Sequence, residues 1–329
     1  MGKPGKFVML AAFAVFASSS SAWAQDIVSV RSGLIHHIEG AVTLEGKPVR
    51  VGNARFPTMA AGEVLEVQRG YAEVLLTPGA FLRLERGASV RLSANTLENT
   101  RLELLKGTAM VEIDELEKGN HISVAVGGYN TSLLKNGLYS FDAEAGRLKV
   151  FDGKAQVSDG AIPVELGKGR TLLFDPAATK PEKFSTKQSK DSLYAWSQQR
   201  AQRIAVANIS ASRELGGSPV RTSFWAWDPW LSMYTFMPRS GYVSNVFGEY
   251  YYNPQTVWVV AQPRVYAGVP AGNSGSSGGS TSAASPAASS PGVSSAPSTS
   301  SGAEIRTRAS DAAGPPSAPV AQTGAVRHR

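Results

Sequence analysis

The chain has 329 residues, of which 42% are hydrophobic and 18% are charged, so it has enough apolar material for a sizeable core and too few charges for a wholly disordered protein. It contains no cysteine and four histidines, which excludes disulfides, thiolate metal sites and cysteine nucleophiles and leaves little for histidine chemistry. Of the net charge of +7, +2 belongs to residues 1–24 and +2 to residues 268–329, and the basic residues between are scattered among acidic ones. Because no run of Lys or Arg could follow a phosphate backbone, a nucleic-acid partner is not expected.

The first 24 residues have the layout of a secretory signal peptide. Two lysines precede an apolar stretch of 11 residues, Phe7 to Ala17, and a small-x-small ending places cleavage between Ala24 and Gln25. The alternative is an uncleaved anchor, but 11 helical residues span roughly 16 Å, about half of a bilayer core. We therefore expect a periplasmic or secreted protein whose mature chain has no transmembrane span.

Residues 30–174 alternate apolar and polar side chains in short runs. Examples are the stretches 72–76, 81–85, 102–104, 110–113 and 148–152. A period of two places the apolar side chains on one face of a sheet and the polar ones on the other, which predicts half-buried strands. Glycines recur between these runs at positions read as turns, including Gly40, Gly70 and the Gly79 of a Pro-Gly pair. The predicted fold class is all-β, an antiparallel β sandwich or roll.

Three segments are expected between this β domain and the C-terminal tail. Residues 175–190 are polar with two prolines and are read as a connector. Residues 191–215 predict one amphipathic helix of about 18–20 residues, with Asp191 as its N-cap and Gly216-Gly217 ending it, packed on the β domain. Residues 218–267 form an aromatic-rich region.

The aromatic-rich region is the one segment whose composition suggests a binding surface. Residues 224–266 hold 13 aromatic residues, and exposed rings could stack on sugars, lie at a membrane surface or anchor a protein partner. Packing onto the β domain is the favoured alternative, although some exposure is expected. The candidate contact residues are Trp225, Trp227, Trp230, Tyr234 and Trp258. Beyond it, residues 268–329 are rich in Gly, Ser, Ala and Pro and are predicted to be disordered.

A series of short motifs from Gly40 to Ile113 carries a family resemblance. The motifs are Gly62-Glu63-Val64-Leu65, the strand 72–76, Pro78-Gly79, the strand 81–84 and a leucine strand, 102–111, that runs through Gly107. In this order they resemble the FecR-like domain of bacterial envelope proteins. The sequence of residues 225–254 is similar to the region that follows such domains in secreted proteins of acidobacterial type. Well-known members relay the state of an outer-membrane receptor to a sigma factor and carry a cytoplasmic segment and a membrane helix, where this chain is expected to have a signal peptide. The resemblance implies an exported interaction domain and no catalytic residues.

Other candidate chemistry is weak. His36 and His37 are adjacent and on a regular strand would face opposite ways, so no shared metal ion is expected. Glu112, Asp114, Glu115 and Glu117 lack calcium-loop spacing and are read as a solvated strand end. A G-x-S-x-G match at residues 275–279 lies in low-complexity sequence. We expect no enzyme activity, cofactor or metal.

Three functions are therefore open. The first is an exported, non-enzymatic binding or scaffold protein with an envelope protein as partner. The second is a cell-surface signalling regulator that contacts an outer-membrane receptor or an anti-sigma system. The third is a binder of peptidoglycan or another glycan that uses exposed tryptophans.

Overall fold

The computed structural model describes residues 31–52, 56–160, 162–177 and 180–261, with side chains up to Val257. The predicted signal peptide with its Ala24–Gln25 cleavage site and the predicted tail lie outside the described residues. Neither described helix combines the length and apolar character needed to cross a bilayer.

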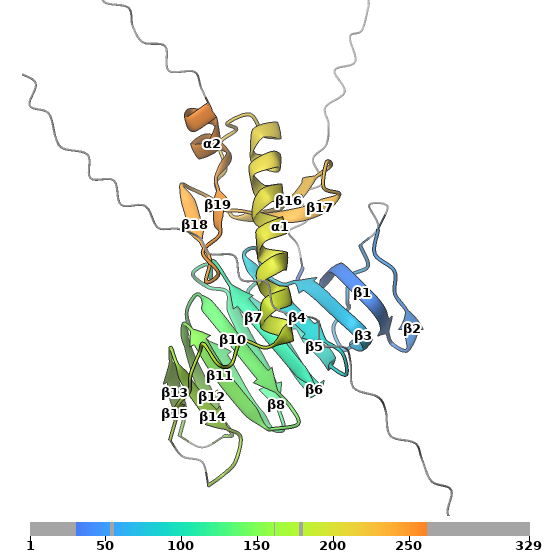
Figure 1. Ribbon diagram of the computed structural model, residues 1–329, viewed down its shortest axis with the longest axis vertical. Coiled ribbons are helices and arrows are strands. Elements are labelled where there is room, and N and C mark those ends of the chain that lie inside the picture. The colour runs from blue at the N-terminus through green and yellow to red at the C-terminus, as the bar shows by residue number, and fades with distance from the viewer. Residues whose placement is uncertain (1–30, 53–55, 161, 178–179, 262–329) are drawn as a thin grey trace, which may run out of the picture. The chain divides into compact units, whose positions relative to one another are not determined.

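The described chain is mostly β structure, as predicted (Figure 1). One sheet contains the first fifteen strands: β1 (Leu34–Leu44), β2 (Lys47–Pro48), β3 (Val64–Leu75), β4 (Ala80–Glu85), β5 (Ser89–Asn95), β6 (Asn99–Lys106), β7 (Thr108–Ile113), β8 (His121–Val126), β9 (Tyr129–Leu133), β10 (Gly137–Asp142), β11 (Arg147–Asp152), β12 (Lys154–Ser158), β13 (Val164–Gly167), β14 (Arg170–Leu173) and β15 (Glu182–Lys183). The short β15 lies within the predicted connector and pairs with β14.

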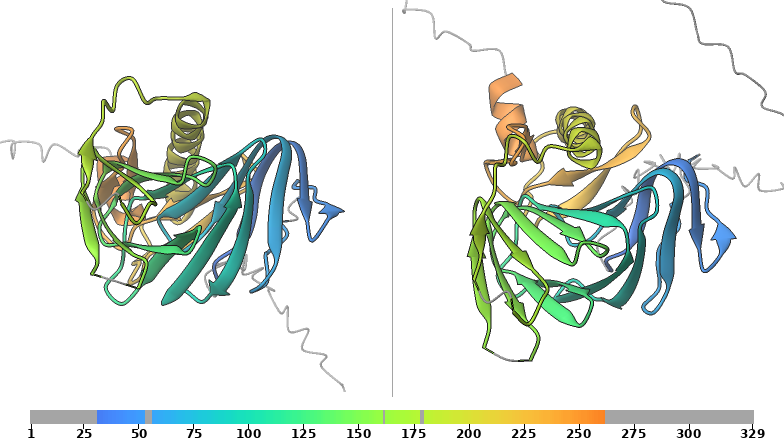
Figure 2. Two further views of the ribbon diagram at one scale, coloured as in Figure 1. Left: turned by 90° about the horizontal axis from the view of Figure 1, so that it is seen from below. Right: turned by 60° about the horizontal axis from the view of Figure 1, so that its bottom comes forward.

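The sheet rolls up so that its two ends meet (Figure 2). Its order is β13-β12-β9-β8-β6-β5-β3-β4-β7-β10-β11-β14-β15, with β1 added against β3, and every described pairing is antiparallel except β6 with β8. The strands β13 and β14 stand near opposite ends of this order, yet only two residues separate them in the sequence. A connection that short forces the sheet to curl, which confirms the predicted roll. The glycine-basic turn at residues 167–170 predicts a hairpin between residues 164–166 and 171–173. This prediction is wrong, because β13 pairs with β12 and β14 pairs with β11.

The interior of the roll is filled by the alternating apolar residues of the sequence pattern. Ile35, Val74, Leu82, Val111 and Phe141, from five strands, all belong to this core and are fully or almost fully buried. The prediction of which strand residues point inward is therefore confirmed for the central strands.

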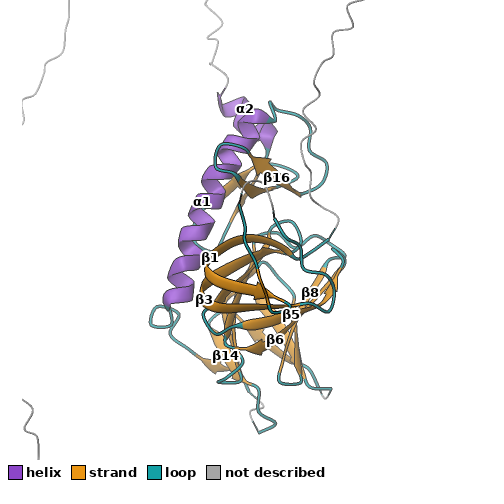
Figure 3. Cartoon of the chain, turned by 90° about the vertical axis from the view of Figure 1, so that its right-hand side faces the viewer, coloured by secondary structure: helices purple, strands orange, loops and turns teal. Residues whose placement is uncertain are grey.

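The N-terminal part of helix α1 (Ser192–Glu214) packs against the outside of the roll, and its C-terminal part extends beyond the roll (Figure 3). Its N-cap is Asp191, whose side chain accepts a hydrogen bond from the backbone N–H of Tyr194, as predicted. The helix has 23 residues, slightly more than expected, and is followed by Gly216, whose φ of +59° suits a chain leaving a helix.

The aromatic-rich region forms two small hairpins and a short helix beside the C-terminal half of α1. These elements are β16 (Phe224–Asp228) paired with β17 (Met233–Met237), β18 (Tyr242–Ser244) paired with β19 (Tyr250–Tyr252), and α2 (Pro254–Ala261). The side chain of Asn208 ties both hairpins to α1, because its Nδ2 donates to the carbonyl oxygens of Phe236 at 2.9 Å and Tyr252 at 3.0 Å and its Oδ1 accepts from the N–H of Tyr252 at 2.7 Å.

Candidate interaction site between α1 and the sheet

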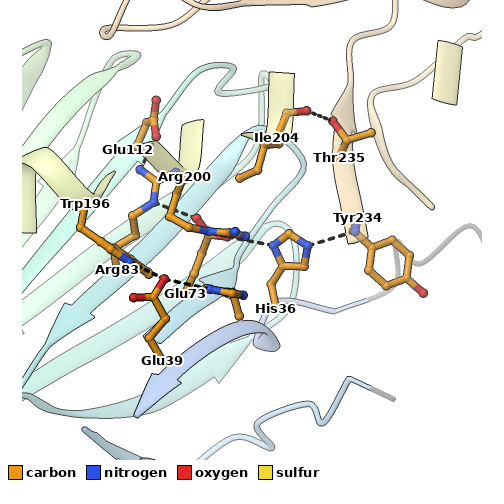
Figure 4. Close-up of polar contacts among 11 residues, drawn as sticks. His36, Glu39, Glu73, Arg83, Glu112, Trp196, Arg200, Ile204, Tyr234 and Thr235 are labelled. Carbon is orange, nitrogen blue, oxygen red and sulfur yellow. Dashed lines mark hydrogen bonds and ion pairs between the residues drawn. The ribbon is translucent and has the colours of Figure 1, made fainter. Parts of the chain in front are cut away.

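The face of the roll under α1 carries charged side chains that are shut off from solvent (Figure 4). Glu73 on β3, Arg83 on β4 and Glu112 on β7 occupy the polar positions of their alternating strands, and each is fully buried. Arg83 donates through Nε to Glu73 Oε2 at 2.8 Å and through Nη1 to Glu112 Oε2. The sequence pattern predicted a solvated face here, and that expectation is wrong for these strands because α1 covers it.

Arg200 of α1 completes this charged layer. Its Nη2 and Nε donate to Glu73 Oε1 at 2.8 and 3.2 Å, and only 4% of the residue is exposed. Burial alone would raise the pKa of Glu73, but Arg200, Arg83 and a hydrogen bond from His36 hold it well below its usual range. The ionised carboxylate thus joins α1 to the sheet through two guanidinium groups.

Apolar contacts flank the charged layer along α1. Toward its N-terminus, Leu193 and Trp196 pack with Met110 of β7, and the Trp196 ring stacks on Tyr71 with centroids 4.8 Å apart. Toward its C-terminus, Ile204 packs with residues of the sheet and of both aromatic hairpins. Arg200 therefore lies at the middle of the helix contact, where a charge pair fixes the helix position.

His36 links the sheet to the aromatic-rich region. Its Nδ1 lies 2.9 Å from Glu73 Oε1, and its Nε2 accepts from the backbone N–H of Tyr234 at 3.0 Å (Figure 4). An imidazole that accepts at Nε2 and faces a carboxylate at Nδ1 is neutral with its proton on Nδ1. Burial lowers the pKa of His36, consistent with the neutral form.

His36 and His37 lie on the same side of the sheet. The β1–β3 register shifts between Ile35 and His37, so that His36 is an extra residue in the strand. Such a bulge re-aims one side chain, and both histidines line one cavity. The expectation that they face opposite ways is wrong for this reason. His37 contacts Glu39 at 3.2 Å and stacks on Trp196.

A second set of buried polar atoms lies at the end of β7. Asp114 is buried with both carboxylate oxygens lacking a hydrogen-bond donor among the described residues, and Glu112 Oε1, Arg83 Nη2 and the Tyr251 hydroxyl are likewise unpaired there. Burial and the neighbouring Glu112 raise the pKa of Asp114 well above its usual range. Burial also raises the pKa of Glu112 despite Arg83. Both carboxyl groups therefore hold a proton more tightly than an exposed carboxyl group does.

These positions correct the interpretation of the acidic cluster as a solvated strand end. Glu112 and Asp114 are buried, whereas Glu115 and Glu117 lie nearer the surface and face Ser223, which donates its hydroxyl to Glu115. Among the residues that the structure describes, no three metal-binding side chains come together.

A cavity of about 480 Å³ opens beside this charged layer. It lies where α1, β1 and the turn between β16 and β17 meet, and Arg200, Arg203, Val206, Leu231 and Met233 are among its lining residues. None of the lining residues that the structure describes is acidic.

The predicted contact residues separate into buried and exposed positions. Trp225 and Tyr234 are buried in the packing between α1, the sheet and the hairpins, and Trp227 is partly buried against Tyr234 and Phe56. Trp230 is 78% exposed at the β16–β17 turn. Trp258 lies in α2, and its side chain is outside the described residues.

The sequence reasoning missed Glu73, Arg83 and Arg200. The sequence does contain an indication that Glu73 and Arg83 are covered. The faces of β3 and β4 that carry these charges also carry Leu75 and Phe81. Large apolar residues next to charges on one strand face indicate that another element covers that face.

No family model and no curated protein matches the chain. Two crystal structures of a "putative anti-sigma factor" from Parabacteroides distasonis ATCC 8503 are similar to 41% of it, at 18% and 17% sequence identity and a TM-score of 0.35. The match spans 64% of those chains, slightly less than two thirds of their length. They are weak structural neighbours, and the resemblance to FecR-like domains stays a prediction from the sequence motifs.

Proposed function

We propose that this chain is a non-enzymatic binding protein of the bacterial cell envelope that docks a protein partner beside the α1 cavity. One observation carries the proposal: most of the described aromatic side chains of the C-terminal region are packed inside, while Val206 and Leu231 of the cavity lining and Trp230 next to Leu231 remain in solvent. These are Val206 at 59%, Trp230 at 78% and Leu231 at 47% exposure, and together we call them the rim.

The rim has the composition of a protein-binding surface. Tryptophan and arginine are enriched among the residues that dominate binding energy at protein interfaces. The rim holds the exposed Trp230, and Arg203 is part of the neighbouring cavity lining. The indole N–H of Trp230 lies 3.3 Å from Glu214 Oε1, which orients the ring without burying it. The helix and hairpin that present the rim are tied to each other, so the surface is preorganised.

The arrangement of polar groups supports a role without catalysis. Glu73, Arg83 and Arg200 neutralise one another beneath the helix, and His36 is held by hydrogen bonds at both ring nitrogens. These groups position α1 and the β16–β17 hairpin, and this placement sets the geometry of the rim.

The experiment uses mature protein immobilised and incubated with detergent-solubilised envelope, in parallel with the variant Trp230→Ala/Leu231→Ser. A matched control is Leu134→Ser, an exposed leucine after β9, away from α1. We expect an envelope protein retained by the wild type and the control and reduced at least about tenfold with the rim variant. Equal retention by all three folded proteins contradicts the proposal.

The identity of the retained protein distinguishes scaffold from signalling. A receptor of the outer membrane or a membrane-bound anti-sigma protein would assign the chain to cell-surface signalling, as the motif resemblance implies. A structural envelope protein would assign it to a scaffold role.

Glycan binding is a second candidate because of one tyrosine surface. Tyr242 and Tyr250 are 62% and 46% exposed, and the Tyr250 and Tyr252 rings stack with centroids 6.2 Å apart. The flat faces of tyrosine rings can stack on sugar rings, and their hydroxyl groups can form hydrogen bonds with sugar hydroxyls. Titration with soluble peptidoglycan fragments, with Tyr242→Ala as the comparison, tests it through intrinsic fluorescence, and an unchanged signal removes the candidate.

A further inference from the structure

The α1 cavity combines apolar walls with cationic groups. Val51, Phe56, Val206, Leu231 and Met233 supply the apolar lining. Its volume of about 480 Å³ falls in the range of small-ligand sites and accommodates one or two amino-acid residues. A guest that fills it must carry an apolar group.

The deepest cation of the cavity is Arg200, and it retains an unused donor. Two of its three nitrogens, Nε and Nη2, are committed to Glu73. The third, Nη1, has no acceptor among the described residues and is not one of the fully buried unpaired atoms, so solvent or a guest can reach it. The unpaired Nη1 of this nearly buried guanidinium can donate to an anion in the cavity, and Glu73 already fixes the position of the group.

Arg203 adds a second cation at the mouth. It follows Arg200 by three residues on α1, and residues three apart share a helix face. It is exposed, and no carboxylate of the described residues lies within ion-pair distance of it. The described lining residues include no acidic side chain, and Glu73 neutralises Arg200 but not Arg203, so the charge at the mouth favours an anion.

We propose that this cavity binds the C-terminal carboxylate of a partner polypeptide that ends in an aliphatic or aromatic residue. This rests on the proposed function and names the part of the partner that the site recognises. In a terminal residue the carboxylate and the side chain branch from one carbon, so both fit a small cavity with a cation beside apolar walls. A phosphate group fits poorly, because the apolar walls would desolvate its second charge without supplying further donors.

The test is calorimetric titration of the full mature chain with an acetylated tetrapeptide that ends in a free leucine. Its C-terminal amide is the matched probe. We expect the free acid to bind at least about tenfold more tightly than the amide, because the amide offers no charge to Arg200 and Arg203. Equal affinities, or no binding of either peptide, overturn the inference.

Two variants locate the contact. Arg203→Gln should weaken the free acid about three- to tenfold and leave the amide unchanged, whereas Arg213→Gln, an exposed arginine farther along the same helix, should alter neither. An unchanged affinity of Arg203→Gln for the free acid contradicts the inference. Octanoate tests the source of the carboxylate, since binding as tight as that of the peptide would overturn the assignment to a polypeptide end.

The peptide titration can fail independently of the envelope-binding experiment that tests the proposed function. If the envelope partner depends on the rim but no carboxylate peptide binds, the inference fails alone. If the peptide binds and the rim variant still retains every envelope protein, the proposed docking fails while the carboxylate site stands.

Discussion

His36 shows how one titratable side chain joins two parts of the molecule. It donates from Nδ1 to Glu73 and accepts from Tyr234 at Nε2, so a second proton would remove the acceptor and leave the Tyr234 N–H unpaired. Because burial lowers the pKa of His36, the unfolded chain takes up this proton more readily than the folded one. The stability from His36 is therefore complete above the ordinary value of 6.5 and is lost as the pH falls below it.

The variant His36→Gln tests this at a single residue. Glutamine can donate to Glu73 and accept from Tyr234 but does not titrate. Between pH 6.5 and 5.5 we expect the wild type to lose up to about 1.4 kcal/mol more unfolding free energy than the variant, measured by urea titration. Contributions from Asp114 and Glu112 cancel because the unfolding free energies of the wild type and the variant are compared at each pH. Unfolding free energies that change with pH equally in both proteins would refute the assigned tautomer.

For Asp114 the expected pH dependence of stability is opposite to that for His36. Its carboxylate oxygens lack donors and lie beside Glu112, and burial and that neighbour raise its pKa, so the folded state binds its proton more tightly than the unfolded state. Its contribution is present below the ordinary value of 3.8 and is lost as the pH rises toward the raised pKa. Asp114→Asn should therefore stabilise the protein increasingly with pH, by about 1.4 kcal/mol per unit across that window.

Thermal unfolding at pH 5 and pH 8 measures the effect. Glu112→Gln is the control, because it removes a partner of the buried Arg83 and should lower the melting temperature at both pH values. A melting temperature of Asp114→Asn equal to that of the wild type at pH 8 would show that Asp114 is not held protonated by its surroundings.

Among the elements, β1 and β3 depart most from the sequence expectation. Gly40 and Gly70 were read as turn residues, but they face each other in the middle of these two long strands. A Cβ at Gly70 would lie 1.9 Å from the carbonyl oxygen of Glu39, so the backbones approach there as only glycine allows. The period-two pattern located the strands, but it could not reveal this close approach or the bulge at His36, because both depend on the partner strand.

Helix α1 holds the two aromatic hairpins mainly through Asn208. Its side chain satisfies three backbone groups of β17 and β19, and it is fully buried. Asn208→Leu should lower the free energy of unfolding by about 2–4 kcal/mol, because those groups lose their partners. Ser212→Ala removes one hydrogen bond to a backbone carbonyl, that of Tyr252, and a weaker one to Met237 Sδ, and should cost about 1 kcal/mol in the same chemical denaturation series. Equal losses for the two variants would contradict a central role of Asn208.

At the scale of the whole molecule, the sequence predicted the roll and the helix but not the surface between them. The inner face follows from local alternation, and the helix from Asp191 and the glycines after Glu214. The covered outer face required knowing that Arg200 meets Glu73, which lies 127 residues earlier. The candidate site depends on this long-range contact. Of the predicted aromatic contacts whose side chains the structure describes, only Trp230 belongs to the rim.

This dependence predicts that the β roll is incomplete without the segments that follow it. A chain of residues 25–189 would expose Phe81, Met110 and Leu138 together with Glu73 and Arg83, all of which are buried beneath α1 and the aromatic hairpins. Uncovered apolar surface of this kind drives association and binds hydrophobic dyes. We expect this fragment to bind anilinonaphthalene sulfonate and to elute as oligomers, and a chain of residues 25–261 to do neither. Adding residues 187–261 in trans should reduce the dye signal, and a monomeric fragment without dye binding would show that the outer face is stable without α1.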